Sequence, residues 1–564
     1  MLKKKYDVIV IGAGHAGLEA AFAVANIGFD VALITINIIS VGAAPCNPSI
    51  GGPAKGVVTR EIDALGGMQG KAADANMLQM KILNTSKGPG VWALRAQIDK
   101  IKYHEWFLDK IKKNKKINLI LDEAVDLIID NNKICGIKLR KYGNITASKV
   151  IITSGVYMNS KTHIGLNSKN EGPMSLERSD TLSDNIRKLG FKIIRLKTGT
   201  PPRILTSSID FNKMQIETGT NEKLSFSHYN SKVLPFSKQV PCYLTYTNEK
   251  THKVIRDNLK LSAMYSGNIS GVGPRYCPSI EDKIVKFPDK IRHQTFMEPE
   301  SLSLPTTYLQ GLSTSLPENV QEKFIKTING LENAIFVKYA YAIEYDAIDP
   351  TQLFPSLETK KINGLYFAGQ VNGSSGYEEA ACQGLIAGIN ATLALKRKKP
   401  LILGRNEAYI GVLIDDLVTK GVTDPYRLLT SRAEYRLLLR NDNADDRLST
   451  YGFNVGLLPH DKYKIYLNNK KKILEIINFL KKETLKKEKY KKFGNNLPHS
   501  MFELLKRQNV FLKDLLPTNK YRALSKNIIN KIEIIVKFDG YIKNQEKNVN
   551  RLKNEDKIKL DKIV

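Results

Sequence analysis

A glycine-rich turn near the amino terminus constrains the fold of this chain more than any other feature. Residues 12–17 read Gly-Ala-Gly-His-Ala-Gly, between an apolar run at 6–11 and a helical pattern at 18–27, and a second apolar run follows at 30–36. In a dinucleotide-binding βαβ unit the first glycine permits the tight turn, the second lets the backbone approach a pyrophosphate, and the third allows close helix–strand packing. The motif therefore predicts a Rossmann-like unit in an α/β fold.

The generic fingerprint is incomplete at the end of the second predicted strand. An acidic residue is expected there for a ribose hydroxyl, but residues 33–37 read Leu-Ile-Thr-Ile-Asn, so we expect neutral polar groups in that role. Two later segments favour FAD over NAD. Residues 149–155 form a strand pattern that runs into a Thr/Gly turn, and residues 365–373 form a strand and a glycine turn before a helix at 378–391.

The distance between these segments predicts an interrupted domain, because the first and the last lie over 300 residues apart. We expect a glutathione-reductase-like FAD-binding domain with an inserted α+β domain and a C-terminal helical domain. The predicted boundaries are 1–200 for the first part of the FAD-binding domain, 201–339 for an inserted NAD-binding or substrate domain, 340–396 for the completion, and 397–564 for a basic helical domain that binds tRNA or a partner.

Composition narrows the functional classes. Lys and Arg number 86 against 56 Asp and Glu, a net charge of +30, which attracts polyanions. Codon bias in an AT-rich genome explains the Lys excess equally well, so specific arginines must carry an RNA argument. Five cysteines without a CxxC pair predict neither a disulfide framework nor a metal site. No apolar run reaches the roughly 20 residues of a membrane helix, and we expect a soluble cytoplasmic protein.

Residues 42–56 are too rich in Gly and Pro for a regular element, and we predict a loop that faces the cofactor. The loop is not a P-loop, because Lys55 is followed by Gly56 rather than Ser or Thr. Cys46 lies in it, either as a reactive thiol or as a small buried hydrophobic residue.

Six motifs resemble the MnmG/GidA family, the FAD-containing subunits of the tRNA uridine 5-carboxymethylaminomethyl modification enzyme. The resemblance runs from about residue 5 to about residue 555. The motifs are Cys-Asn-Pro-Ser-Ile-Gly-Gly at 46–52, Leu-Lys-Thr-Gly-Thr-Pro-Pro-Arg at 196–203, Thr-Asn-Glu-Lys-Thr-His at 247–252, Gly-Pro-Arg-Tyr-Cys-Pro-Ser-Ile-Glu-Asp-Lys at 273–283, Gly-Tyr-Glu-Glu-Ala-Ala at 376–381 and Thr-Ser-Arg-Ala-Glu-Tyr-Arg-Leu at 430–437.

The resemblance implies a reaction. With a GTPase partner, MnmE, members of the family add an aminomethyl or carboxymethylaminomethyl group to C5 of the wobble uridine of certain tRNAs. The methylene carbon comes from methylenetetrahydrofolate and the amine from glycine or ammonium. FAD carries hydride, NADH reduces it, and a homodimer is implied. Family members usually continue beyond the segment that matches residues 533–543, so we expect this chain to lack the usual C-terminal end.

The resemblance also implies site residues. Val125, in a predicted strand, would meet the adenine edge or be a core valine, and in the NAD segment Arg275 and Lys283 would neutralise phosphates while Glu281 or Asp282 meets a ribose. The implied FAD residues are Gly12, Ala13, Gly14, His15, Ala16, Gly17, Val125, Ser179 and Gln370. The implied NAD residues are Gly273, Pro274, Arg275, Tyr276, Cys277, Pro278, Ser279, Ile280, Glu281, Asp282, Lys283, Ile284, Val285, Lys286 and Phe287.

The family resemblance implies that Cys46 and Cys277 take part in covalent catalysis on the uracil ring. A thiolate that adds to the ring makes the neighbouring ring carbon a nucleophile, which can attack an electrophilic methylene group. Arg275, Lys283 or Lys55 could lower the thiol pKa. The sequence leaves open whether either thiol attacks the base or serves redox chemistry or structure.

Residues 426–440 are predicted to form an RNA-binding helix. Arg432, Arg436 and Arg440 are spaced i, i+4 and i+8 and would share one face, and with Arg427 they are our candidate tRNA contacts. The alternative is that these arginines pair inside the protein with Glu434, Asp442 or Asp445.

Three other functions remain open. A flavin dehydrogenase of a small metabolite would need no basic helical tail. A folate- and FAD-dependent tRNA uridine methyltransferase shares the fold but lacks much of the insertion and the Arg-rich region. A non-catalytic RNA-binding protein would leave the cofactor turn and both cysteine motifs unexplained.

Overall fold

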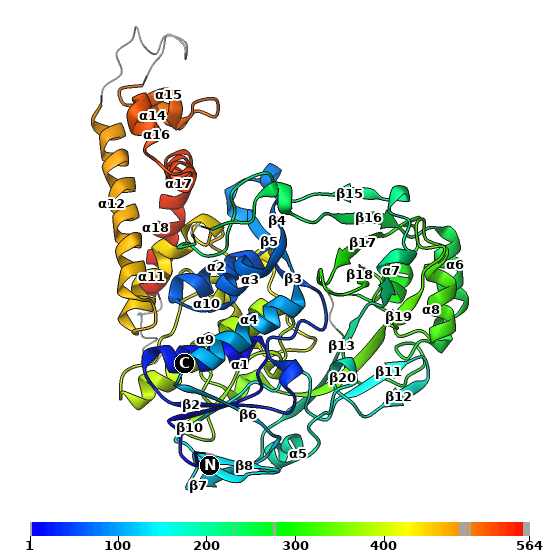
Figure 1. Ribbon diagram of the computed structural model, residues 1–564. Coiled ribbons are helices and arrows are strands. Elements are labelled where there is room, and N and C mark those ends of the chain that lie inside the picture. The colour runs from blue at the N-terminus through cyan, green and yellow to red at the C-terminus, as the bar shows by residue number, and fades with distance from the viewer. Residues whose placement is uncertain (1–2, 231, 274–277, 484–492, 494–497, 556–564) are drawn as a thin grey trace, which may run out of the picture.

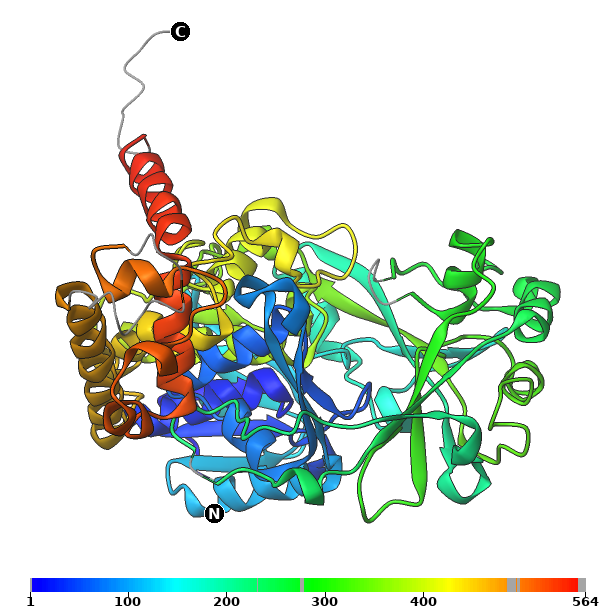
Figure 2. The ribbon, with the colours of Figure 1, turned by 90° about the horizontal axis from the view of Figure 1, so that it is seen from above.

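The fold has a central α/β region between two flanking parts. The computed structural model describes residues 3–230, 232–273, 278–483, 493 and 498–555. Figure 1 shows the helices of the C-terminal part on one side of the central region and the mostly green inserted part on the other. The view from above in Figure 2 shows the same separation.

The central sheet is built from strands that are distant in sequence. Its order is β21-β10-β1-β2-β6, and every pair is parallel. The apolar side chains of the inner strands are buried, as a parallel sheet covered on both faces requires. The bounds are Val8–Ile11 for β1, Val31–Thr35 for β2, Ile117–Leu121 for β6, Lys149–Ile152 for β10 and Leu365–Phe367 for β21.

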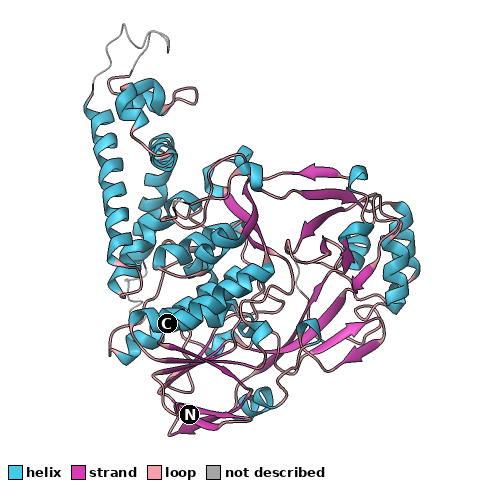
Figure 3. Cartoon of the chain, viewed as in Figure 1, coloured by secondary structure: helices cyan, strands magenta, loops and turns pink. Residues whose placement is uncertain are grey.

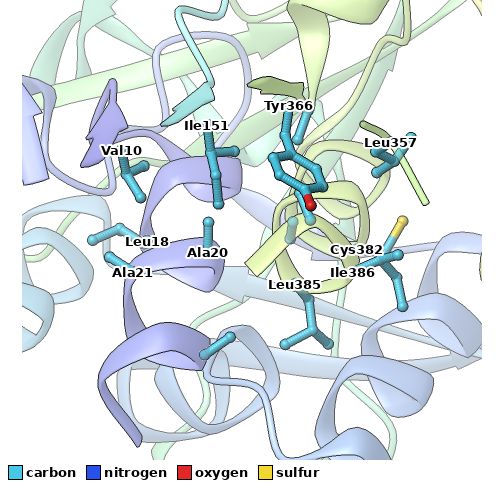
Figure 4. Close-up of a cluster of buried hydrophobic side chains, with 14 of the residues drawn as sticks. Val10, Leu18, Ala20, Ala21, Ile151, Leu357, Tyr366, Cys382, Leu385 and Ile386 are labelled. Atoms are coloured by element: carbon cyan, nitrogen blue, oxygen red, sulfur yellow. The ribbon is translucent and has the colours of Figure 1, made fainter. Parts of the chain in front are cut away.

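Helix α1 (His15–Ile27) follows β1 and packs against α9 (Tyr377–Leu395). The two helices approach so closely that a Cβ on Gly384 would overlap the backbone carbonyl of Ala16. The contact therefore tolerates only glycine at this position. Figure 4 shows side chains of both helices beneath the sheet residues. The strand, helix and strand predicted over residues 6–36 are confirmed, as is the closure of this region by residues beyond 365.

Smaller elements complete the central region. The meander β7 (Ala124–Asp130), β8 (Lys133–Leu139) and β9 (Gly143–Thr146) forms one sheet, and β3 (Ser49–Gly51), β5 (Ala93–Ile98) and β4 (Met77–Leu83) form another. The covering helices are α2 (Lys55–Leu65), α3 (Gln69–Asn76), α4 (Lys100–Lys113) and α5 (Thr181–Lys188).

The inserted part contains a six-stranded sheet with helices on its outer side (Figure 3). A four-stranded sheet of order β12-β11-β20-β13 connects it to the central region, and a six-stranded antiparallel sheet of order β15-β16-β17-β18-β14-β19 carries its own apolar core. The bounds are Lys161–Ile164 for β11, Asn167–Lys169 for β12, Ile193–Thr200 for β13, Arg203–Leu205 for β14, Gln215–Glu217 for β15, Cys242–Tyr246 for β16, Gln294–Pro299 for β17, Thr306–Gln310 for β18, Phe336–Lys338 for β19, Tyr341–Ile348 for β20, Glu249–Asp257 for α6, Ile280–Lys286 for α7 and Glu318–Ile325 for α8.

The C-terminal part is helical and has a separate hydrophobic cluster. Figure 1 shows the long α12 beside α17, and the two helices are in contact. The described helices are α10 (Tyr409–Lys420), α11 (Ala444–Asn454), α12 (His460–Lys482), α14 (Met501–Leu505), α15 (Leu512–Leu515), α16 (Thr518–Arg522), α17 (Lys526–Lys537) and α18 (Asp539–Glu555). None of the helices in the described ranges is long and apolar enough to cross a membrane.

Candidate functional site

A cavity of about 660 Å³ opens at the carboxyl ends of the central strands. Its volume lies in the usual range for small-molecule and cofactor sites. Residues that end or closely follow the central strands line it, as in other open α/β sheets: Ile11, Thr35, Asp122, Thr153 and Gln370. The Cys46 loop and the near edge of the inserted part supply further walls.

The glycine turn forms one wall of this cavity, because residues 12–16 line it. A Cβ on Gly12 would overlap the carbonyl of Thr153, and one on Gly17 would overlap the carbonyl of Gly12. Gly14, in contrast, has no atom of the described residues within 4 Å of its Cβ position. In the part of the chain that the structure describes, no side chain caps the N-terminus of α1, so its first N–H groups are suited to bind a phosphate.

The cavity wall at the end of β2, where a ribose contact was expected, differs from the expectation of neutral groups alone. Thr35 lines the cavity, whereas the side chain of Asn37 accepts the N–H of Ile39, 3.0 Å away. Acidic side chains are present after all, just beyond the neighbouring strand, because Asp122 and Glu123 follow β6 and line the cavity. Sequence reasoning missed Glu123, because only the sheet order brings the end of β6 beside the end of β2.

Two of the other residues implied for FAD lie at the cavity and one does not. Ser179 lines it and donates a hydrogen bond of 3.1 Å to Glu123, and Gln370 lines it three residues after the end of β21. Val125 lies one residue beyond the lining residue Ala124, and its carbonyl accepts a hydrogen bond of 2.9 Å from Asn185.

Cys46 lines the cavity in a loop that is held from two sides. The phenol oxygen of Tyr377 accepts the N–H of Cys46 at 2.9 Å and that of Asn47 at 3.1 Å. The guanidinium of Arg203 donates to the carbonyl of Pro45 at 2.6 Å. The prediction of a loop throughout residues 42–56 is wrong in part, because β3 pairs with β5 and α2 begins at Lys55.

A buried ion cluster beside the thiol loop was not predicted. The Lys55 ammonium lies 3.1 Å from Glu378 and 3.0 Å from Glu379; both carboxylates are buried, and the lysine side chain is 13% exposed. Burial lowers the pKa of Lys55, but the two carboxylates raise it by more, so the lysine stays charged. Its charge is compensated locally, which weakens the expectation that Lys55 lowers the thiol pKa. The residues of this cluster were visible only as parts of separate motifs.

His15 and Tyr377 stack on each other at the floor of the site. Their ring centroids are 4.3 Å apart and their planes differ by 18°. Burial lowers the pKa of His15 to about 4 and raises the pKa of Tyr377 well above its ordinary value. Both rings are therefore neutral near pH 7.

The segment implied for NAD lies only partly at the cavity. Pro278 and Lys283 line it, and Lys283 donates a hydrogen bond to the carbonyl of Gly311 at 2.8 Å. Glu281, one of the two carboxylates expected to meet a ribose, is buried and accepts hydrogen bonds from Ser262 and from the backbone of Ser315. The alternative, Asp282, stays a prediction. Residues 274–277, which include Arg275 and Cys277, lie outside the described residues.

The helix predicted over residues 426–440 is wrong. The segment is extended at first and then forms a single 3-10 turn and irregular turns, because tertiary partners take its N–H groups: Tyr426 donates to Gly373, and Leu428 to Glu379. The arginines therefore share no helical face. Arg427 lines the cavity, Arg432 stacks on Tyr426, Arg436 is exposed, and Arg440 is buried and pairs with Asp442.

The parallel sheet, the glycine cradle and the cavity at the strand ends define a Rossmann-like dinucleotide-binding fold of the flavoprotein type. A family model described as "Glucose inhibited division protein A" matches residues 7–399, and one described as "tRNA modifying enzyme MnmG/GidA C-terminal helical domain" matches residues 460–546. The chain belongs to the MnmG/GidA family, as its sequence motifs indicated. The described residues contain no group of three or more His, Cys, Asp or Glu that could hold a metal ion.

Named relatives agree with this assignment. The chain is 59% identical to the tRNA uridine 5-carboxymethylaminomethyl modification enzyme MnmG of Ureaplasma parvum, over 100% of this chain and 92% of the relative. It is 55% identical to the MnmG of Mycoplasma genitalium, over 98% and 91%. The structure of Aquifex aeolicus GidA superimposes with a TM-score of 0.91 at 43% identity, covering 100% of this chain and 91% of that one.

Proposed function

We propose that the protein is a flavin-dependent enzyme that modifies the wobble uridine of tRNA. One observation carries the proposal: the dinucleotide turn and Cys46 line the same cavity. The relatives named as tRNA uridine 5-carboxymethylaminomethyl modification enzymes support the substrate and the reaction class.

The residues present fit FAD. The turn is tight because Gly12 and Gly17 have no side chain where a Cβ would overlap the backbone. The open position at Gly14 leaves room for a pyrophosphate, and the N-terminus of α1 offers N–H groups to it. Buried Nε2 of His15 has no protein partner among the described residues and borders the same space. FAD would supply hydride transfer when bound.

The thiol of Cys46 would act on the uracil ring. A thiolate that adds to the ring makes the neighbouring carbon nucleophilic toward an electrophilic one-carbon unit, and loss of the proton from that carbon then releases the thiol. In this proposal methylenetetrahydrofolate supplies the carbon, NADH supplies reducing equivalents, and the GTPase MnmE is the partner of a cytoplasmic homodimer. The family resemblance supports these four elements.

Mass spectrometry of wobble nucleosides tests the function. A strain depleted of this protein should lose the modified uridine and regain it with the wild-type gene. Cys46→Ser should retain flavin and fail to restore the nucleoside, whereas Cys135→Ser, on the remote strand β8, should restore it. Full restoration by Cys46→Ser would contradict the catalytic role of this thiol, and 5-methyluridine as the affected nucleoside would indicate the methyltransferase alternative.

A further inference from the structure

The loop that carries Cys46 is held by a residue that is distant in sequence. Tyr377 is the first residue of α9, 331 positions from Cys46, and its phenol oxygen accepts the N–H of both Cys46 and Asn47. A phenol oxygen has two acceptor sites, so these two N–H groups occupy both. The pair fixes the two peptide planes that flank the Cα atom of Cys46, from which its side chain projects.

The ring of Tyr377 is itself held in place. It stacks on His15 of the dinucleotide turn, and its backbone carbonyl accepts a hydrogen bond of 3.2 Å from Gln69. Burial raises the pKa of its hydroxyl well above the ordinary value, so it stays a neutral phenol at working pH and is unsuited to be a general base. Its geometry is that of a fixed acceptor.

Other contacts restrain the same loop on its carbonyl side. Arg203 donates to the carbonyl of Pro45 at 2.6 Å, and Thr200 donates to the same oxygen at 3.4 Å. Arg203 is buried and ion-paired with Glu300 at 3.2 Å. Because these contacts hold carbonyl oxygens, they do not replace an acceptor for the N–H groups of residues 46 and 47.

We propose that Tyr377 is a positioning residue for Cys46. Its aromatic ring connects the loop that carries Cys46 to His15 of the dinucleotide turn. The inference rests on the proposed function for the role of Cys46, although the geometry of the loop does not depend on it. Tyr377→Phe separates the two contacts, because it keeps the ring on His15 and removes the acceptor from the loop. The N–H groups of Cys46 and Asn47, two half-buried residues, would then lose their protein acceptor, and the loop would relax.

The test measures the reactivity of Cys46 directly. Freshly reduced, flavin-loaded protein is alkylated with iodoacetamide between pH 6 and 10, and the labelled Cys46 peptide is quantified by mass spectrometry. The matched control is Tyr409→Phe, which removes a buried hydroxyl that has no partner among the described residues and lies on α10. We expect Tyr377→Phe to retain flavin, to move the midpoint of the pH–rate profile by at least half a pH unit, and to reduce wobble modification about tenfold or more, with the control unchanged.

Each outcome decides the proposal. An unchanged pH–rate profile for Tyr377→Phe, or a loss of flavin from this variant, would overturn it. If the variant does not fold, hydrogen exchange of the wild-type protein gives the answer, because the amides of Cys46 and Asn47 should be protected, and rapid exchange of both would overturn the proposal. The alkylation and hydrogen-exchange measurements do not require tRNA modification. If the wild-type protein did not modify tRNA, the proposed function would be refuted, and the alkylation profile would still test the positioning role of Tyr377.

Discussion

The Lys531 ammonium of α17 lies 2.6 Å from a carboxylate oxygen of Asp445 on α11. The same ammonium lies 2.9 Å from Asp446, and the side chain of Lys531 is 10% exposed. Burial lowers the pKa of Lys531, but the two carboxylates raise it by more, so the lysine is charged. This contact joins the last helices to the part of the chain that packs on α2.

Lys531→Ala should loosen the C-terminal helices, because it removes the ammonium group that pairs with the buried carboxylate of Asp445 and with the half-buried carboxylate of Asp446. Loss of one partner of a buried ion pair costs about 3–5 kcal/mol. Limited proteolysis should then cut within residues 498–555 faster than in the wild type. The matched control is Lys526→Ala on the same helix, whose exposed pair with Glu222 is worth about 1 kcal/mol or less. Equal proteolysis of both variants would show that the buried pair does not hold these helices.

Gly14→Val should give a folded protein without flavin. The Cβ of residue 14 has no neighbour within 4 Å, and its backbone is extended with φ −72°, so valine fits the chain but fills the space next to the uncapped helix N-terminus. Absorbance near 450 nm should be lost while the melting temperature matches that of the flavin-free wild type. A flavin content equal to that of the wild type would contradict the assignment of this turn.

Gly384→Ala should destabilise the protein, because the new methyl group overlaps the backbone carbonyl of Ala16 and forces α9 away from α1. Such overpacking costs about 1–3 kcal/mol. Thermal unfolding of the flavin-free protein measures the effect. Gly540→Ala is a suitable control, because nothing lies within 4 Å of its Cβ position. A melting temperature unaffected by Gly384→Ala would show that the two helices can separate without cost.

The buried carboxyl of Glu19 should make stability depend on pH. Burial raises its pKa from 4.5 to about 7, against the opposing effect of the N–H groups of Met68 and Gln69. The pKa of Glu19 is higher in the folded than in the unfolded protein. The contribution of Glu19 to the free energy of unfolding is therefore largest below about pH 4.5, and it falls by about 3 kcal/mol as the pH rises through 7. Glu19→Gln should therefore show a smaller fall of the urea midpoint between pH 5 and pH 8 than the wild type does. Parallel falls would contradict this.

Two arginines of the segment 426–440 should behave differently. Arg436 is exposed, so Arg436→Ala should weaken tRNA binding, lower the salt dependence of binding by about one ion, and leave the melting temperature unchanged. Arg440 is buried, with its guanidinium on Asp442 and on the carbonyl of Leu437, so Arg440→Ala should lower the melting temperature. Titration of tRNA at two salt concentrations and thermal unfolding separate the two. Salt dependence unaffected by Arg436→Ala would exclude a phosphate contact by this residue.

Local patterns predicted the parts of the fold that local interactions determine. The glycine turn, its flanking strands and α9 follow from apolar runs and backbone requirements within about 20 residues. The helix prediction for residues 426–440 was wrong because interactions distant in sequence determine the conformation of this segment. Its arginine spacing is helical, but its N–H groups bond to Gly373 and Glu379, which no local pattern contains.

The candidate site was predicted as a set of residues rather than as an arrangement. Cys46 and the glycine turn were identified, and both line the cavity. The Tyr377 anchor, the Lys55 ion cluster and the placement of Glu123 join segments between about 85 and 330 residues apart, so they depend on sheet order and helix packing.

The interrupted central sheet also has a consequence for biosynthesis. Strand β21 and helix α9 leave the ribosome about 350 residues after β1, which at about 5–20 residues per second corresponds to roughly 20–70 s. During that time the face of α1 that Gly384 later covers has no partner, and Tyr377 has not been made. The nascent chain must therefore hold an unfinished nucleotide-binding region while the inserted part is translated, and cofactor capture follows the synthesis of this region rather than accompanying it.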